Sequence, residues 1–458
     1  MTSPVGRGDE RPLSVPTKLV LALGDLSGNA ALSTLSLVYA TYFLVEVVGL
    51  RPALAGIIPL VGRTVDAITD PAMGRISDHT RLRLGRRRPY LLAGAVPFGV
   101  AFALLWSQAP PAWSEEARCV FYAVTYVLLA CAMTVLLVPY LALLPEMALG
   151  YDERTSVSAY RHVGSVIGIG LALGLRPTAA ALGGGPRGFQ SAGILYGVVL
   201  SLPWLVLFAC TWERPDFRER PAAMPLMAGL RTLARHRAYL ALTGLYLCGR
   251  IAMDLVGALL ILYFTHYLGR SRDFEPAMLA FLAAVMLAAP LWLAVGRGWE
   301  KVTVFRAGAL WWMSVQAVLA LARPEWPRWA MFATAVVLGV GYAAVDFMPW
   351  AMIGDVVDED DLATGERREG LYNGAFGFLR KLAGAAAVFL ALAVLDVAGY
   401  RPGEPPSPGV LTTLRLLTGV GPIVLLALAL ACSTAYPLDR RRHAEILQAL
   451  DARARRRR

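Results

Sequence analysis

The chain alternates long apolar runs with short polar connections, and this pattern predicts membrane-spanning helices. A helix needs about 20 mostly apolar residues to cross the hydrocarbon core. Six such runs precede a polar stretch rich in Arg and Pro, and six follow it. We expect spans near residues 18–47, 53–76, 90–107, 117–145, 160–182, 191–212, 238–268, 276–296, 303–322, 329–353, 368–398 and 410–437. The expected divisions are a first six-helix half, a middle loop, a second six-helix half and a basic cytoplasmic tail, at 1–212, 213–237, 238–437 and 438–458.

Composition agrees with a polytopic membrane protein. The 458 residues are 57% hydrophobic and only 17% charged, which is too apolar for a soluble chain of this length. Five cysteines lie in or beside apolar runs without metal-ligand spacing, so we expect neither a disulfide framework nor a metal centre. The sequence has no nucleotide motif and no nucleophile–base set, and it does not predict an enzyme.

The net charge of +11 gathers in alternate loops. Arginines follow the second span, fill the middle stretch and end the tail as RARRRR, whereas the other loops are sparse in them. By the positive-inside rule, both termini and the middle loop are cytoplasmic. The excess is therefore a topology signal of a multi-pass protein in the plasma (inner) membrane. We expect the lipid bilayer and a small molecule as partners, a functional monomer, and no nucleic acid.

A weak internal repeat links the two halves. The segments 138-VPYLALLPEM-147 and 348-MPWAMIGDVVDED-360 both place a Pro–aromatic pair before apolar or small residues and then an acid. The loops after spans 2 and 8 correspond likewise. Two related halves are typical of a transporter with a central site, and neither a channel nor a membrane enzyme predicts this symmetry.

Asp66 and Asp70 lie one helical turn apart within the second span. Intramembrane acids are costly and usually mark ion or substrate pathways. Side chains at i and i+4 share a helix face, and two close carboxylates repel unless a proton or cation lies between them. With Thr69 nearby, an all-oxygen set suits Na⁺ or H⁺ better than a transition metal. We expect a coupling-cation site here; the alternative is a structural ion pair with Lys381.

The roles of several other polar residues stay open at this point. Lys381, expected at the middle of the eleventh span, either balances the two acids or acts as a structural lock. Arg161 either serves a site or marks the cytoplasmic edge. Asp25 is expected to cap a helix or contact a loop. Asp254 and Asp346 are intramembrane acids whose facing the pattern does not define.

Charged residues at the cytoplasmic helix ends predict gating clamps that break and re-form as the halves move. The alternative is a solvated run of charges. The second half offers acids and bases for the same task in 354-GDVVDEDDLATGERREG-370. The candidate gate residues are Asp78, Arg81, Arg86, Arg87, Arg88, Asp355 and Asp358.

These motifs resemble the glycoside–pentoside–hexuronide:cation symporters, the melibiose-carrier group of the major facilitator superfamily. The resemblance runs across nearly the whole chain. It implies an all-α integral membrane fold of twelve helices in two pseudo-symmetric six-helix halves, working by alternating access. The segments that carry it are 66-DAITDPAMGRISDHTRLRLGRRRPY-90, 138-VPYLALLPEMALGYDERT-155 and 349-PWAMIGDVVDEDDLATGERREGLYNGAFGFLRKLAG-384.

The resemblance also assigns roles to single positions. The cation ligands of the family fall on Asp66, Thr69, Asp70 and Thr134, and its span-11 lysine falls on Lys381. A cation site is therefore expected to be preserved in this chain.

The sugar-binding positions of the family are less well kept. An arginine is retained as Arg161, whereas two acids correspond to Asn29 and Leu137, and a stacking tryptophan corresponds to Leu141. A buried polar site selects by its hydrogen bonds, so losing two acids is expected to change the substrate. The candidate substrate contacts are Asn29, Arg161, Asp346 and Trp350.

Three functions follow from these patterns. The first is cation-coupled symport of a sugar or glycoside. The second is cation-coupled transport of a lipid-like or other amphipathic solute, because the animal lysolipid transporter related to this family also keeps the span-2 acids and the span-11 lysine. The third is a non-transporting membrane protein, such as a sensor or scaffold.

Overall fold

The computed structural model describes residues 13–148, 151–213, 232–366 and 368–457. Within these ranges the regular structure is helical, apart from one isolated bridge between Leu82 and Gly85. The predicted all-α fold is confirmed, and eleven helical segments of the described chain are long and apolar enough to cross a membrane. Most of the predicted middle loop, residues 214–231, lies outside the described residues.

The second predicted span is the one that hydropathy alone does not identify. It forms α2 (Pro52–His79), whose 28 residues at about 1.5 Å each give a helix about 42 Å long, enough to cross a bilayer. Its charged side chains, among them Arg63, Asp66 and Asp70, lower its hydropathy. The helix with the weakest membrane signal is thus the one that carries the predicted cation ligands.

Local chemistry marks where several helices begin and end. Ser14, Ser114 and Ser407 precede α1, α4 and α14, and each side chain accepts a hydrogen bond from the backbone N–H three residues on. The long helix α12 (Arg328–Thr364) ends at Gly365, which has φ +80°, a conformation that glycine adopts without steric cost.

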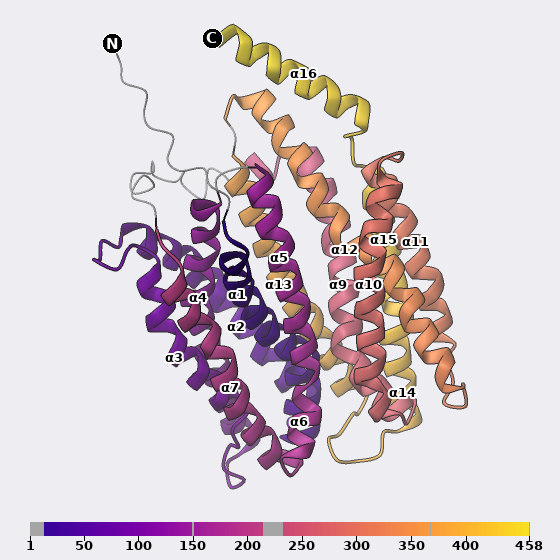
Figure 1. Cartoon of the computed structure of the whole chain (residues 1–458). Coiled ribbons are helices and arrows are strands. Elements are labelled where there is room, and N and C mark those ends of the chain that lie inside the picture. Colours follow the sequence, from indigo (N-terminus) through magenta and orange to yellow (C-terminus); the bar gives the residue numbers. More distant parts are fainter. Residues whose placement is uncertain (1–12, 149–150, 214–231, 367, 458) are drawn as a thin grey trace. The chain divides into compact units, whose positions relative to one another are not determined.

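The chain divides into two compact units. The first lies within residues 1–50 and 57–221. In it, α1 packs against α5, and α3 packs against α4 and α7 (Figure 1). Its helices are α1 (Val15–Thr34) with its π-helical continuation η1 (Leu35–Val47), most of α2, α3 (Arg88–Leu105), α4 (Glu115–Met147), α5 (Tyr151–Leu173), α6 (Leu175–Ala181) and α7 (Gly185–Cys210).

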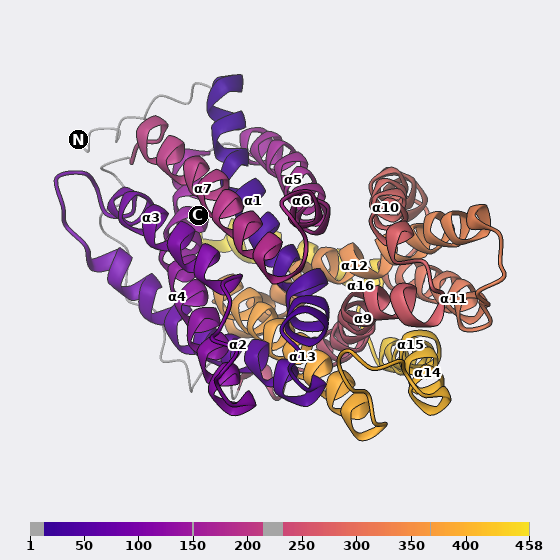
Figure 2. The ribbon, with the colours of Figure 1, turned by 90° about the horizontal axis from the view of Figure 1, so that it is seen from below.

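The second unit lies within residues 51–56 and 222–458. There α12 packs against α10 and α11, and α9 packs against α13 and α15, an arrangement that Figure 2 shows along the helix axes. Its helices are α9 (Arg237–Leu262) with η3 (Tyr263–Tyr267), the short η4 (Ser271–Asp273), α10 (Phe274–Gly296), α11 (Lys301–Ala320), α12, α13 (Glu369–Val397), α14 (Pro408–Arg415), η5 (Leu416–Val420), α15 (Gly421–Thr434) and α16 (Arg440–Arg457).

Buried aromatic rings fill part of the core of the first unit. Trp106 stacks on Phe189 with ring centroids 5.7 Å apart, and Phe43 and Tyr39 meet Trp106 edge-on at 4.9 and 5.4 Å. All four side chains are buried. Such pairs stabilise packing by about 0.5–1.5 kcal/mol each beyond the area that they bury.

The helix α12 extends well beyond its predicted span. The tenth span was expected to end near residue 353, but α12 continues to Thr364. Its acidic last turns look like a loop in the sequence, and their side chains have basic partners, as described below. The basic tail forms a separate helix, α16.

Candidate functional site

Three of the four predicted cation ligands meet between α2 and α4. Thr134 Oγ1 donates a hydrogen bond to Asp70 Oδ1 at 2.7 Å, and it lies 3.4 Å from Thr69 Oγ1. Thr69 Oγ1 donates to the Val65 carbonyl at 3.1 Å. The two threonine hydroxyls are within hydrogen-bond distance of each other, and either can be the donor. The arrangement gathers carboxylate and hydroxyl oxygens around one point of the first unit.

The fourth predicted ligand, Asp66, has a partner that sequence reasoning missed. Arg63 Nη1 lies 3.0 Å from Asp66 Oδ2, one turn earlier on α2. Asp66 is only 5% exposed, so this ion pair neutralises a buried carboxylate. Lys381, the predicted counter-charge, lies on α13 of the second unit with its side chain half-buried.

A second polar cluster in the first unit joins α1, α4 and α5. Arg161 Nε and Nη2 lie 2.6 and 3.0 Å from the two carboxylate oxygens of Asp25, and Tyr140 Oη also hydrogen-bonds Asp25. The predicted capping role of Asp25 is wrong, because its side chain points inward from the interior of α1 and is 13% exposed. Arg161 belongs to this cluster.

Asn29, the position at which the resemblance places a sugar-binding group, lies one turn after Asp25 on α1. Its amide donates to the Asp25 carbonyl at 2.9 Å and to Ser165 Oγ at 3.1 Å. Both of these bonds use the amide nitrogen of Asn29, and the amide oxygen is the other polar atom of the side chain. The acid missing from position 29 has a counterpart one helical turn earlier, at Asp25.

The second unit holds a matching cluster that includes both of its predicted substrate contacts. On α9, Arg250 binds Asp254 through two contacts, Nη2 to Oδ1 at 2.6 Å and Nε to Oδ2 at 3.2 Å. Asp346 of α12 lies 3.5 Å from Arg250 Nη1. Trp350 follows Asp346 by one turn and packs edge-on against Tyr246, at 5.8 Å between ring centroids.

The internal repeat of the sequence places equivalent residues in these two clusters. Each repeat has a proline followed by an aromatic residue, Tyr140 in the first unit and Trp350 in the second. Tyr140 contacts the Asp25–Arg161 pair, and Trp350 lies beside the cluster around Arg250. Each unit thus has an aromatic side chain next to an arginine–aspartate pair within its spans.

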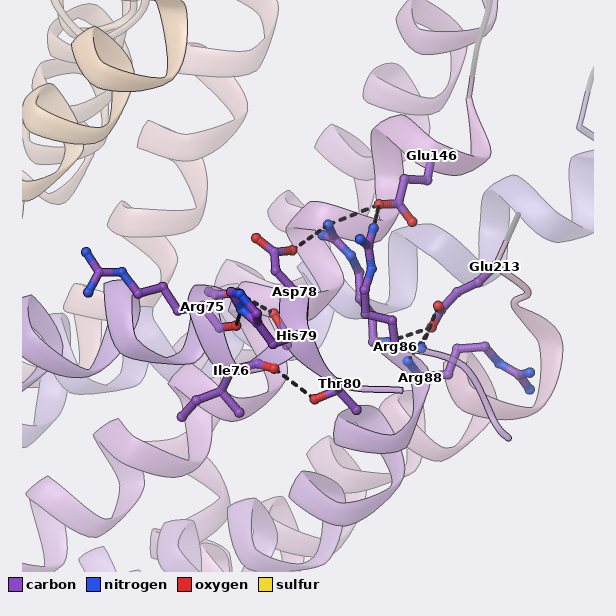
Figure 3. A network of polar contacts seen from close by, with 12 residues as sticks. Arg75, Ile76, Asp78, His79, Thr80, Arg86, Arg88, Glu146 and Glu213 are labelled. Carbon is purple, nitrogen blue, oxygen red and sulfur yellow. Dashed lines mark hydrogen bonds and ion pairs between the residues drawn. The ribbon is translucent and has the colours of Figure 1, made fainter. Parts of the chain in front are cut away.

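Most of the predicted gate residues of the first unit belong to one connected network (Figure 3). Arg86 and Arg87 both bind Glu146, at 2.6 and 3.0 Å, and Arg87 also reaches Asp78 at 3.1 Å. Burial lowers the pKa of Arg87 from its ordinary value, although Glu146 acts in the opposite direction. The predicted gate residue Arg81 is exposed and is not part of these contacts within the described chain.

Glu213, which follows α7, anchors the same loop. Its carboxylate accepts backbone N–H bonds from Arg86, Arg87 and Arg88 at 2.7, 2.6 and 2.8 Å (Figure 3). These amides open α3, where unsatisfied donors and the helix dipole favour an anion. The Arg88 side chain in turn donates to the Phe208 carbonyl at 2.8 Å. Sequence reasoning missed Glu213, because it begins the polar middle stretch.

In the second unit, the acid that corresponds to Glu146 in the internal repeat is Asp355, near the end of α12. Lys301, the first residue of α11, binds both of its carboxylate oxygens at 2.7 and 2.8 Å. His443 of α16 lies 3.1 Å from Asp358 and 3.5 Å from Asp355. Both predicted gate acids of this unit therefore contact basic residues, one of them in the tail.

Three more acids at the end of α12 have separate partners. Glu359 bonds His236 at 2.9 Å, Asp360 pairs with Arg368, and Asp361 pairs with Arg453 of α16 at 2.6 Å. The hydrogen bonds that Arg368 donates to Asp360 raise the pKa of its guanidinium. Each of these acids in the last turns of the helix has a basic partner, in a segment that looks like a loop in the sequence.

A family described as MFS/sugar transport protein matches residues 21–440. Two solved structures share the fold: a bacterial homolog of the human lysosomal transporter Spinster, at 12% identity and a TM-score of 0.68, covering 95% of this chain and 99% of that one, and the nucleoside transporter NupG, at 11% identity and 0.65, covering 91% and 98%.

Three relatives are similar over nearly their full length. The chain is 30% identical to the inner membrane symporter YicJ of Escherichia coli K12, covering 93% of this chain and 92% of the relative. It is 26% identical to the sodium-dependent lysophosphatidylcholine symporter 1-A of Danio rerio, covering 94% and 87%. It is 27% identical to the glucuronide carrier protein homolog of Escherichia coli K12, covering 96% of each.

Proposed function

Because the chain belongs to the MFS/sugar transport protein family, within the glycoside–pentoside–hexuronide:cation symporter group, we propose that it couples movement of a small organic solute to a cation, Na⁺ or H⁺, by alternating access. The chain is a multi-pass membrane transporter and not an enzyme. The proposed location is the plasma (inner) membrane, with cytoplasmic termini, as the loop arginines favour. The proposed functional unit is a monomer, and the coupling ion is the only cofactor proposed.

The threonine pair between α2 and α4 carries this proposal. The Thr134 hydroxyl bonds Asp70, the Thr69 hydroxyl bonds the Val65 carbonyl, and the two hydroxyl oxygens lie 3.4 Å apart. A carboxylate with two hydroxyl oxygens beside it favours a hard cation, which oxygen ligands bind best. We assign Asp70, Thr69 and Thr134 as direct ligands of the coupling cation.

Asp66 and Lys381 have supporting roles in this scheme. The Arg63–Asp66 pair already neutralises one acid, so Asp66 joins the cation only if Arg63 releases it. We propose that Lys381 balances the acids when the cation is absent, on grounds of charge balance in an apolar medium. Cation and solute then raise each other's affinity by the same factor, because coupling between two sites is reciprocal.

The first substrate class we propose is a sugar or glycoside. The cluster of Asp25, Tyr140 and Arg161 offers a carboxylate, a hydroxyl and a guanidinium in one place. Sugar hydroxyls both donate and accept hydrogen bonds, so a site with both kinds of partner suits them. Asn29 extends the same polar surface of α1 by one turn.

A lipid-like solute is the second candidate. The observation that favours it is the similarity to a relative whose name describes a sodium-dependent lysophosphatidylcholine symporter, over 94% of this chain. Leu137 and Leu141, at the positions of a family acid and a family tryptophan, add apolar surface, and Leu141 is 50% exposed. This candidate and the first share the same cation chemistry.

The deciding experiment measures the thermal stability of purified protein in NaCl, LiCl and choline chloride at several pH values. A ligand that binds only the folded state raises the melting temperature by mass action. We expect Na⁺ or H⁺ to stabilise the wild type and to have little effect on Asp70→Asn. Asp396→Asn, which removes an acid at the end of α13, is the matched control and should keep the full response.

Two outcomes contradict the proposal. If neither cations nor pH affect the wild type, the oxygen cluster is structural. If Asp70→Asn responds as the wild type does, the cation binds elsewhere. Uptake into proteoliposomes with and without a Na⁺ or H⁺ gradient then tests coupling, using matched glycosides and lysolipids to separate the two substrate classes.

A further inference from the structure

The spans of the second unit contain a two-layer cluster built on α9, α12 and α13. Three pairs of residues, each spaced by one helical turn, place an aromatic ring next to a charge: Tyr246 with Arg250, Trp350 with Asp346, and Phe376 with Arg380. Since α12 runs opposite to α9 and α13, the three aromatic residues lie on the side of the α12–α13 connection. The three charged residues form the adjoining layer.

The aromatic layer is defined by ring contacts. Tyr246 and Phe376 stack with centroids 4.1 Å apart. Trp350 meets both edge-on, at 5.8 and 5.2 Å. Trp350 remains 43% exposed, so part of its ring is open for contact with a further group.

The charged layer is unevenly paired. Arg250 is neutralised by Asp254 through two contacts, and Asp346 stands 3.5 Å away with 42% of its side chain exposed. A side chain at Gly384 would lie 2.3 Å from Asp254 Oδ2, so this glycine lets Asp254 approach α13 closely.

Arg380 is the charged residue of this layer that forms no ion pair within the described chain. The like charge of Arg250 acts on it, as do the opposite charges of Asp254 and Asp346. Among the described residues, Arg380 forms no hydrogen bond or ion pair within the distances of the pairs above. A guanidinium cannot lose its proton to escape this cost. Arg250 and Arg380 are thus two neighbouring positive charges, and of the two only Arg250 forms an ion pair among the residues that the structure describes.

We propose that this cluster binds an anionic group of the transported solute, with Arg380 as the principal contact and Trp350 as the surface for the adjoining apolar or ring portion. The proposal rests on the proposed transport function and deepens it: the substrate is an amphipathic organic anion. Arginine suits this role because its planar fork matches a carboxylate or phosphate. A purely structural cluster would instead leave Arg380 paired with an acid, as Arg250 is with Asp254.

One ligand chemistry admits two sources, a small anionic glycoside or an anionic lysolipid. The probes are therefore two matched pairs, phenyl glucuronide against phenyl glucoside, and lysophosphatidylglycerol against monoacylglycerol. Within each pair the charged group is the main difference. Binding is measured by quenching of tryptophan fluorescence in the full-length protein, with Trp350→Phe to identify the signal from the site.

For wild type we expect the anionic member of at least one pair to bind about tenfold or more tightly, the range for a charge-assisted hydrogen bond. Arg380→Gln should remove that preference while leaving the weak binding of the neutral member unchanged. Arg380→Lys, which keeps the charge without the fork, should retain part of it. Arg401→Gln, which removes an arginine beyond α13, is the matched control and should retain all of it.

The proposal is overturned if wild type binds both members of each pair equally, if it binds none of the four probes, or if Arg380→Gln keeps the anion preference. Should Arg380→Gln fail to fold, the wild-type ratio and Arg380→Lys still decide. The cation response of the melting temperature is recorded on the same samples. An intact cation response with no anion preference rejects this inference alone, whereas a lost cation response rejects the proposed coupling.

Discussion

Asp25 and Arg161 form a two-contact ion pair between α1 and α5, with Arg161 Nε 2.6 Å from Asp25 Oδ2 and Nη2 3.0 Å from Oδ1. Tyr140 of α4 bonds the same carboxylate. The pair therefore ties three helices together at a point well inside their lengths. The side chains of Arg161 and Asp25 are 24% and 13% exposed, so each charge depends on the other for most of its stabilisation.

Removing one partner of this pair should destabilise the protein more than removing both. Asp25→Ala or Arg161→Ala leaves an uncompensated buried charge, which typically costs about 3–5 kcal/mol. The double variant Asp25→Asn with Arg161→Gln should recover much of this loss but not solute transport. Chemical unfolding in detergent measures the free-energy differences.

The pair of Asp396 and Arg401 is the matched control, because Arg401 is 48% exposed. Breaking it should cost about 0–1 kcal/mol, as exposed ion pairs do. Equal losses at the two pairs would contradict the interpretation of Asp25–Arg161 as a buried pair.

The cation site makes a prediction about Thr134. Thr134→Val keeps the shape of the side chain but removes the hydroxyl that bonds Asp70 at 2.7 Å. We expect the affinity for the coupling cation to fall about tenfold, since one ligand is lost. Thr134→Ser keeps the hydroxyl and should retain most of the affinity. Titrating the melting temperature with NaCl or pH provides the measurement, and equal affinities in the two variants would exclude Thr134 as a ligand.

The loop before α3 should be sensitive at both Gly85 and Glu213. Gly85 has φ +107°, and a Cβ there would lie 2.6 Å from Glu213 Oε1. Gly85→Ala is therefore expected to displace the carboxylate from the three amides that it binds. Glu213→Gln should cost about 0.5–2 kcal/mol, the range for losing a charged cap at a helix N-terminus.

Hydrogen exchange at the backbone of residues 86–88 tests this prediction directly. Exchange should become faster in both Gly85→Ala and Glu213→Gln. Gly183→Ala is a useful control, since that glycine also has positive φ but its Cβ would meet no neighbour within 4 Å. Unchanged exchange in Glu213→Gln would show that other groups satisfy these amides.

The helix α16 should detach when its contacts with α12 are removed. Arg453 bonds Asp361 at 2.6 Å and the Asp361 carbonyl at 3.0 Å, and His443 reaches Asp358. In the double variant Arg453→Gln with His443→Gln, we expect trypsin to cleave the tail several-fold faster. Arg441→Gln is the control, because Arg441 is 89% exposed and pairs within α16. Equal cleavage rates would mean that these contacts do not hold the tail.

Several features of the fold could be predicted from sequence because they depend on local physics. The apolar runs must span about 30 Å of hydrocarbon, and their lengths leave little freedom. The span limits agree with the helices to within a few residues for most of the chain, for example 90–107 against Arg88–Leu105 and 117–145 against Glu115–Met147. The largest exceptions are the end of α12, whose acids pair with residues far along the chain, and the start of α5, which begins at Tyr151 and not near residue 160.

The site was only partly predictable for the same reason. The grouping of Asp70, Thr69 and Thr134 follows from a motif and from a resemblance, and the structure places these side chains together. Arg63 was one turn away in the sequence and was overlooked because the acids alone were considered. Arg250 stands four residues before Asp254 on α9, a spacing visible in the sequence, whereas Asp346 lies on another helix. Glu213 has no local signal, since its partners are the backbone amides of Arg86, Arg87 and Arg88.

Sequence by itself determined the membrane class, the family and the motif that carries the candidate cation ligands, because hydropathy, charge bias and short motifs are local properties. Only the tertiary structure decided which charged side chains form ion pairs with one another. Asp25 changed from a helix cap to the partner of Arg161, and Arg380 became the cation without an acid, because helices far apart in sequence bring their side chains together. In a medium that solvates charge poorly, those pairings decide which polar residues are structural and which remain available for a ligand.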